Sequence, residues 1–141
     1  MSDFEAFFAQ NKVKAKDVEY VASTGFINPK TGKPFAWILR KIDESVNKKL
    51  KESSMKKVAN SKTATRYQLD NDTYLCKLTV ATVAFPNLND KKLQDDWNVM
   101  DAEELIRKML SAGEYANLMI KAQEVNDFDI DFSALVEEAK N

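Results

Sequence analysis

The chain has 141 residues, of which 44% are hydrophobic and 30% are charged. This length and composition predict one globular domain with a core of its own, and they exclude a disordered chain. The net charge of -1 hides an asymmetry, because residues 1–70 carry 14 Lys or Arg against 8 Asp or Glu, whereas residues 71–141 carry 7 against 14. A chain with opposite charges in its two halves can attract copies of itself, which makes a homo-oligomer one interpretation. The alternative is that the two halves of the chain differ only in the charged residues that they expose to solvent.

Two features of the composition limit the chemistry of the chain. It has no histidine, which excludes Ser/His and Cys/His catalysis and histidine-ligated metal sites. Its one cysteine, Cys76, cannot form an internal disulfide, and this suits a reducing compartment. Acidic residues stand near the N-terminus where a secretory signal would carry basic ones, and no apolar run approaches the roughly 20 residues that span a bilayer. We therefore expect a cytoplasmic protein that is not an enzyme, with no cofactor and no membrane partner.

Residues 1–42 predict a short helix followed by a β-hairpin. Ser2 and Glu5 fit a capping box, and Phe4, Phe7 and Phe8 have the spacing of one helical face. We expect this face to dock onto the body of the protein, and a site for a partner is the alternative. A strand is predicted from Val18 to about Ala22. The alternating segment PFAWILR follows a run of turn formers, so it predicts the second strand, with Trp37 in the core.

Residues 43–70 predict a basic helix and a polar link. The helix is expected from Asp43 to Val58, and the polar residues from Asn60 to Gln68 predict a mobile or irregular extended segment. The lysines between Lys48 and Arg66 are candidates for contacts with nucleic acid. The acidic pI of about 5.6 and the lack of interleaved aromatic residues argue against that partner. A solvated face, or one that meets the acidic half of a neighbour, is the expected use.

Residues 71–141 predict a succession of short helices. The run TYLCKLTVATVAF has the apolar spacing of a helix, whereas its β-branched residues favour a strand; on its length and capping it is interpreted as a helix that ends at Pro86. Asn89 and Asp101 are expected to cap the next two helices. Gly113 separates two further helical patterns, and a last helix is expected from about Phe132. The predicted fold is a single α+β domain over residues 1–141, mainly α-helical, in which the helix and hairpin pack on a bundle of about four to five short helices.

The apolar residues of the C-terminal helices are the candidates for binding a partner. Methionine is unusually frequent there, and its flexible side chain suits surfaces that accept varied apolar helices. Filling of an irregular core is the alternative for each of these residues taken singly. The candidate contact residues are Trp97, Met100, Leu105, Met109 and Met119.

One metal site has to be considered. Asp127, Asp129, Asp131 and Glu138 occupy the first, third, fifth and twelfth places of a calcium-binding loop. The sixth place is Phe132, where the sharp turn of such a loop requires glycine. Acidic residues at the N-terminus of a helix explain the same pattern, so we predict no bound metal.

Five segments together resemble a known family: FFAQNKVKAKDVEYVAST, GKPFAWILR, FPNLND, MDAEELIRKML and GEYANL. In combination they are similar to the XkdN-like tail assembly chaperones of phages and PBSX-type prophages, although the tryptophan of DDWNVM stands where tyrosine or another aromatic residue is expected. The resemblance implies a cytoplasmic protein, absent from the virion, that binds the tape measure protein, keeps it soluble and helps tail tube subunits polymerise around it. It implies no catalytic residues. A structural tail protein of the virion, such as a tube or connector component, and a regulator that binds nucleic acid are the alternatives.

Overall fold

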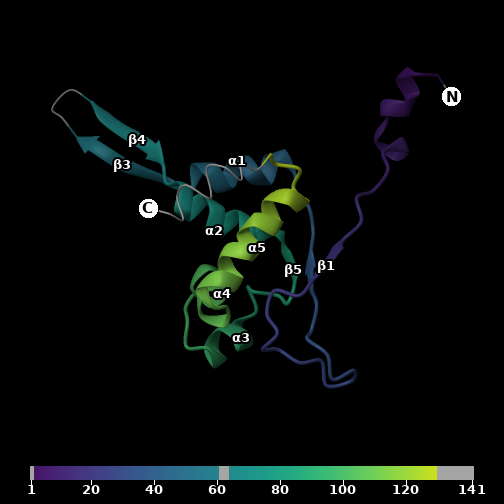
Figure 1. Ribbon diagram of the computed structural model, residues 1–141. Coiled ribbons are helices and arrows are strands. Elements are labelled where there is room, and N and C mark those ends of the chain that lie inside the picture. Colours follow the sequence, from purple (N-terminus) through teal and green to yellow (C-terminus); the bar gives the residue numbers. More distant parts are fainter. Residues whose placement is uncertain (1, 61–63, 130–141) are drawn as a thin grey trace.

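The computed structural model describes residues 2–60 and 64–129 (Figure 1). A body of helices and a small sheet occupies the centre, with one projection on each side. The first is an arm formed by the N-terminal residues, and the second is a pair of strands, β3 (Met55–Asn60) and β4 (Thr65–Leu69). The described part of the body contains five α-helices, α1 (Glu44–Glu52), α2 (Asn71–Thr82), α3 (Lys91–Asp96), α4 (Ala102–Met109) and α5 (Ala112–Val125).

Helix α2 lies at the centre of the body and packs against α1, α4 and α5. It begins where the Asp70 carboxylate accepts a hydrogen bond from the Thr73 N–H at 3.3 Å. Its buried threonines are tolerated because the Thr79 and Thr82 hydroxyls donate to backbone carbonyls one turn earlier, at 2.7 and 2.8 Å. The predicted helix after Asp70 is therefore confirmed, and it ends at Thr82 rather than at Pro86.

The predicted hairpin of the first 42 residues is also confirmed, as part of a larger sheet. Strands β1 (Val18–Tyr20) and β2 (Trp37–Leu39) pair antiparallel, with Tyr20 opposite Trp37. A third strand, β5 (Val83–Phe85), pairs with the other edge of β2 and was not predicted, because it continues the apolar run of α2 without a break in the pattern. Trp37 and Leu39 are buried in the core, as expected for Trp37.

The core joins this sheet to the C-terminal helices. Leu39 of β2, Leu105 and Ile106 of α4 and Leu118 of α5 are fully buried in one apolar cluster. Helix α4 is capped by Asp101, whose carboxylate accepts from the Glu104 N–H at 2.8 Å, as predicted. The cap of α3 is Asp90 rather than the expected Asn89. Ser111 begins α5 with a complete capping box, so this helix starts before Gly113.

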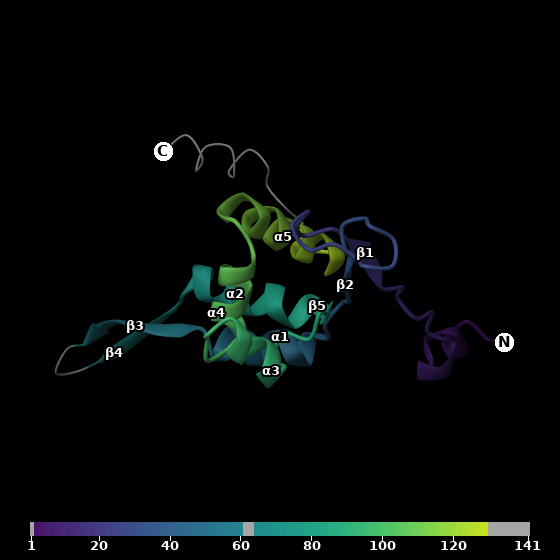
Figure 2. The same ribbon diagram turned by 90° about the horizontal axis from the view of Figure 1, so that it is seen from below.

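The prediction of a docked N-terminal helix was wrong. Residues Phe4–Phe7 and Ala9–Asn11 form two short 3-10 turns, η1 and η2, and neither contains a buried residue. The arm extends away from the body in both views (Figures 1 and 2). Turns of three or four residues hold few hydrogen bonds, and in the described part of the chain their phenylalanines do not pack against the body.

The prediction for residues 43–70 was wrong in its second half. Helix α1 ends at Glu52, and the residues interpreted as a polar link pair as antiparallel strands, with Lys57 opposite Tyr67. The chain leaves and rejoins the body at one point, where the Asp70 N–H donates to the Ser54 carbonyl at 2.8 Å. We name residues Met55–Asn60 and Thr65–Leu69 the β3–β4 ribbon. Because both of its faces are exposed, its sequence lacks the alternation of apolar and polar residues that marks a half-buried strand.

The fold is therefore mixed α+β and is not a mainly helical bundle. In the described part of the chain, two antiparallel sheets accompany the five α-helices, one of three strands in the body and one of two strands in the ribbon. The helix predicted from about Phe132 lies outside the described residues.

Candidate functional site

Four aromatic residues form two ring pairs that are linked through a backbone hydrogen bond in the loop between β1 and β2. Phe26 and Phe35 stand opposite each other within the loop between β1 and β2, where the Phe35 N–H donates to the Phe26 carbonyl at 2.7 Å. The Phe35 ring lies 5.6 Å from the Phe85 ring of β5, and the Phe26 ring lies 6.3 Å from that of Trp97, at the end of α3. We name Phe26, Phe35, Phe85 and Trp97 the aromatic row.

The aromatic row is anchored in the core and remains open to solvent. Trp97 packs against the buried cluster, whereas Phe85 exposes 47% of its surface. Met100 follows Trp97 in the chain and is 81% exposed. The link that carries it is fixed by Asn98 in a left-handed conformation, φ 57°, and by the Met100 N–H, which donates to Glu104 Oε2 at 3.2 Å. Ordered, partly exposed aromatic and thioether groups can bind an apolar segment of another protein.

The five predicted contact residues do not share one environment. Trp97 and Met100 lie at the α3 end of the aromatic row. Leu105 is 0% exposed and belongs to the core. Met109 is half-buried against the core cluster, and Met119 is half-buried on α5. Whether the exposed members of this set contact a partner remains a prediction.

Sequence reasoning missed three members of the aromatic row, Phe26, Phe35 and Phe85. The two loop residues stand at the ends of the segment FINPKTGKPF, which has turn formers at its centre. That symmetry is the signal that would have placed them side by side, because residues equally distant from a tight turn face each other across it.

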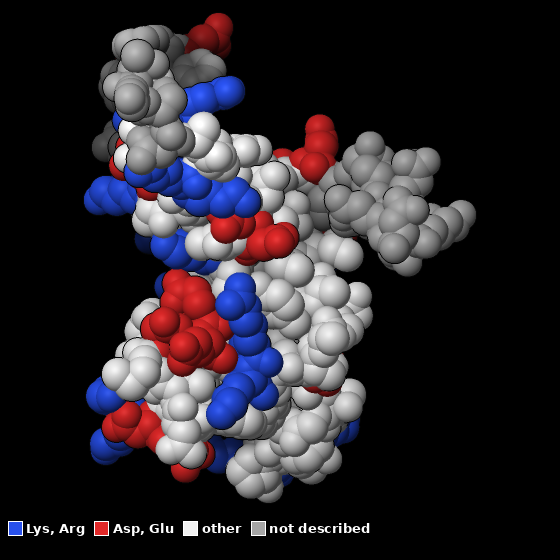
Figure 3. Space-filling model, turned by 90° about the vertical axis from the view of Figure 1, so that its left-hand side faces the viewer, with Lys and Arg blue, Asp and Glu red and all other residues white. Residues whose placement is uncertain are grey.

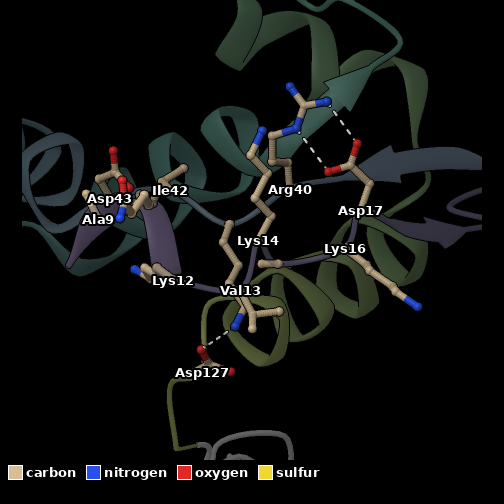
Figure 4. Close-up of a pocket in the computed structure, with 13 residues that line it drawn as sticks. Ala9, Lys12, Val13, Lys14, Lys16, Asp17, Arg40, Ile42, Asp43 and Asp127 are labelled. Atoms are coloured by element: carbon tan, nitrogen blue, oxygen red, sulfur yellow. Dashed lines mark hydrogen bonds and ion pairs between the residues drawn. The ribbon is translucent and has the colours of Figure 1, made fainter. Parts of the chain in front are cut away.

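A second feature is a cleft of about 1100 Å³ between the base of the arm and the body (Figure 4). Arg40 Nη2 and Asp17 Oδ2 lie 2.8 Å apart, and Lys41 Nζ and Asp127 Oδ2 lie 2.7 Å apart. The hydrogen bond from Arg40 lowers the pKa of the Asp17 carboxyl. The remaining cations of the lining, Lys12, Lys14 and Lys16, come from the arm.

The described residues hold no group of three or more His, Cys, Asp or Glu side chains able to bind a metal ion. Of the calcium-loop candidates, Asp127 pairs with Lys41 and Asp129 is exposed. Asp131 and Glu138 lie outside the described residues, so the prediction about this loop is untested. Cys76 is buried. None of the helices in residues 2–60 and 64–129 has the length and apolar character needed to cross a membrane.

Comparison with known proteins decides the family. A sequence model of the family described as "Phage XkdN-like tail assembly chaperone protein" matches residues 4–140. The chain belongs to this family. The resemblance inferred from five short segments is thereby confirmed over almost the whole chain. Tail assembly chaperones act on other proteins during phage tail assembly, which is a non-catalytic role, and their partners are proteins.

Two relatives and one solved structure are similar to the chain over most of its length. A Bacillus subtilis (strain 168) protein described as "Uncharacterized protein YqbN" is 31% identical and covers 99% of this chain and 93% of its own. The "Phage-like element PBSX protein XkdN" of the same strain is 28% identical, with 99% and 94% covered. The crystal structure of the protein YqbN matches with a TM-score of 0.77 and 26% identity, over 92% of this chain and 99% of that one.

Proposed function

We propose that this XkdN-like chaperone binds the tape measure protein of a long-tailed phage, keeps it soluble and promotes assembly of the tail tube around it. It acts in the cytoplasm of the bacterial host and is absent from the mature virion. The observation that supports this function is the aromatic row with Met100 beside it, a partly exposed apolar surface on a member of a tail assembly chaperone family.

The proposed mode of binding is a helix laid against an apolar surface. Amphipathic stretches of the tape measure present apolar side chains at helical spacing, and the ring edges of Phe85 and Trp97 with the thioether of Met100 cover them. Aromatic rings supply large contact areas at low conformational cost, and methionine adapts to side chains of different shapes. Met109 and Met119 add half-buried apolar surface, and Leu105 supports the site from within the core.

Co-expression with the tape measure protein tests the function directly. We expect the soluble fraction of the tape measure protein to rise when the chaperone is present. The double variant Phe85→Ser with Met100→Ser should abolish most of this gain, whereas Val46→Ser, an exposed apolar change on α1, should preserve it. Unchanged solubility of the tape measure protein with and without the wild-type chain would refute the proposal.

Mass spectrometry of purified phage particles separates the chaperone from a structural tail protein. A chaperone is absent from particles and present in lysates that contain unassembled tails. Detection of the chain in mature particles at the stoichiometry of a tube or connector subunit would favour the structural alternative.

A further inference from the structure

Strands β1 and β2 separate at the base of the N-terminal arm. Their ladder ends where Val18 stands opposite Leu39. One step further along, only side chains join the two strands, with Asp17 Oδ2 and Arg40 Nη2 2.8 Å apart. Beyond that ion pair, residues 12–16 and 41–43 share no backbone hydrogen bond, and both segments line the cleft of about 1100 Å³.

Charge explains why the strands stop pairing at this point. Continuing the register of Val18 with Leu39 would place Lys16 opposite Lys41. Like charges directly opposite each other destabilise an antiparallel pair. Lys41 instead pairs with Asp127, just after α5, at 2.7 Å. The opening of the cleft therefore follows from the charge pattern of the two segments.

The segment of residues 12–16 offers an unpaired strand edge. The chain leaves η2 with Lys12 in an extended conformation, φ -71° and ψ 126°. Among the described residues, the N–H groups from Val13 to Lys16 donate to no other group of the chain. The Val13 side chain is also open to solvent, with 89% of the residue exposed. An edge of this kind can accept a strand of another protein through main-chain hydrogen bonds.

The lining of the cleft is basic. It contains five Lys or Arg against three Asp, and two of these aspartates are neutralised by Arg40 and Lys41. Within the described part of the chain, Lys12, Lys14 and Lys16 form no ion pair, and they stand at alternate positions of the segment. Figure 4 shows Lys14 on the same side of the cleft as Arg40. A strand paired with this segment would bring every second side chain near a lysine.

We propose that the cleft binds an extended segment of a partner protein in which acidic and apolar residues alternate. The backbone of the partner adds a strand to this edge, and its carboxylates pair with Lys12, Lys14 and Lys16. Its apolar side chains, on the opposite face of the added strand, contact Val13 and Ile42 of the lining. This mode differs from the helix bound by the aromatic row, and neither proposal rests on the other.

Fluorescence anisotropy of a labelled synthetic peptide measures the binding to the full-length chain. The probe has about eight residues in which glutamate and valine alternate, enough to cover the segment as a strand. We expect saturable binding with a dissociation constant below about 1 mM, weakened by high salt because salt screens the ion pairs. A second probe has the same sequence and charge but carries a methyl group on every backbone nitrogen. It should bind about tenfold more weakly or worse, because it has no main-chain donors for strand pairing.

Two charge-reversed variants locate the site. The cleft variant, Lys12→Glu with Lys14→Glu, should raise the dissociation constant of the first probe about tenfold or more, because it opposes like charges. The control, Lys56→Glu with Lys57→Glu, makes the same change of net charge on the β3–β4 ribbon and should bind as the wild type does. Figure 3 shows Lys and Arg side chains gathered around the upper part of the surface, where the ribbon points toward the viewer, and the arm lies on the opposite side of the body (Figure 1). Circular dichroism verifies that both variants are folded.

Three results would overturn the proposal. If the wild-type chain shows no saturable binding up to about 1 mM probe, the cleft has no such ligand. Binding that then appears in the variant Asp131→Ser, Glu137→Ser and Glu138→Ser would assign the cleft to the chain's own C-terminal residues. Equal binding of the two probes would show a surface that attracts anions without pairing a strand. Loss of binding in the ribbon control, with the cleft variant unaffected, would place the site on the ribbon.

Discussion

At the scale of single residues, Leu105 and Met100 are expected to contribute very differently to the stability of the fold. Its side chain is fully enclosed by the core, so Leu105→Ala leaves a cavity and should lower the free energy of unfolding by about 2–5 kcal/mol. Met100→Ala removes an exposed side chain and should change this free energy by about 0.5 kcal/mol or less. Urea unfolding of the two variants measures both values. Similar losses in the two variants would contradict the placement of Leu105 and Met100.

Asn126 connects three segments at the end of α5. Its Oδ1 accepts from the Ile42 N–H at 2.9 Å, and its Nδ2 donates to the Thr82 hydroxyl at 2.8 Å, so one side chain ties α5 to the end of α2 and to the link before α1. Asn126→Ala removes the acceptor of the Ile42 N–H and one of the two hydrogen bonds of the Thr82 hydroxyl, and it should cost about 2 kcal/mol of unfolding free energy. The matched control is Asn117→Ala on the exposed face of the same helix. An equal effect of the two changes in chemical denaturation would argue against this role.

At the scale of elements, the β3–β4 ribbon is expected to be separable from the body. The two ends of the ribbon meet at its base, where the Asp70 N–H donates to the Ser54 carbonyl. No residue of β3 or β4 with a described side chain is buried. Replacing residues 56–68 with a two-glycine link should leave the helical circular dichroism and the cooperative thermal transition intact. Loss of that transition would show that the ribbon supports the fold.

The elements that could be predicted from sequence carry their own local signals. Asp101 is a cap three residues before a glutamate, and the helix after it has a clear apolar stripe. The pairing of β1 with β2 follows from an alternating run, with Trp37 and Leu39 on one face, after a cluster of turn formers.

The elements that were missed depend on tertiary context. The phenylalanines of the arm satisfy a helical spacing, but that pattern states only which residues share a face and not whether a surface exists to receive it. Val83 of β5 continues the apolar pattern of the preceding helix in the sequence, and only its pairing with β2 in the folded protein makes it part of a strand. The aromatic row joins residues from a loop, a strand and the end of a helix, so spacing along the chain reveals its Phe26–Phe35 pair but not the addition of Phe85 and Trp97. These corrections explain why the fold class was expected to be more helical than it is.

At the scale of the whole molecule, stability should depend on pH in both directions. The pKa of Asp17 is lowered by the hydrogen bond from Arg40, and that of Asp70 by the N–H of Thr73, each from an ordinary value of 3.8. Their contribution is present above that value and is lost as the pH falls through the lowered pKa of the folded state. Burial raises the pKa of Tyr74 and Tyr115 above the ordinary 10.0, and this contribution is lost as the pH rises through the raised pKa.

Urea unfolding at a series of pH values measures this dependence. The free energy of unfolding should be nearly constant from about pH 5 to about pH 9 and should fall on both sides of that range. Tyr74→Phe should reduce the loss on the alkaline side. A free energy that does not change between about pH 5 and about pH 3 would contradict the assignment of the two carboxyl groups.

The placement of the arm and the ribbon on opposite sides of the body has a geometric consequence. A partner that binds one of these two projections leaves the other accessible, so one copy could contact two partners that do not touch each other.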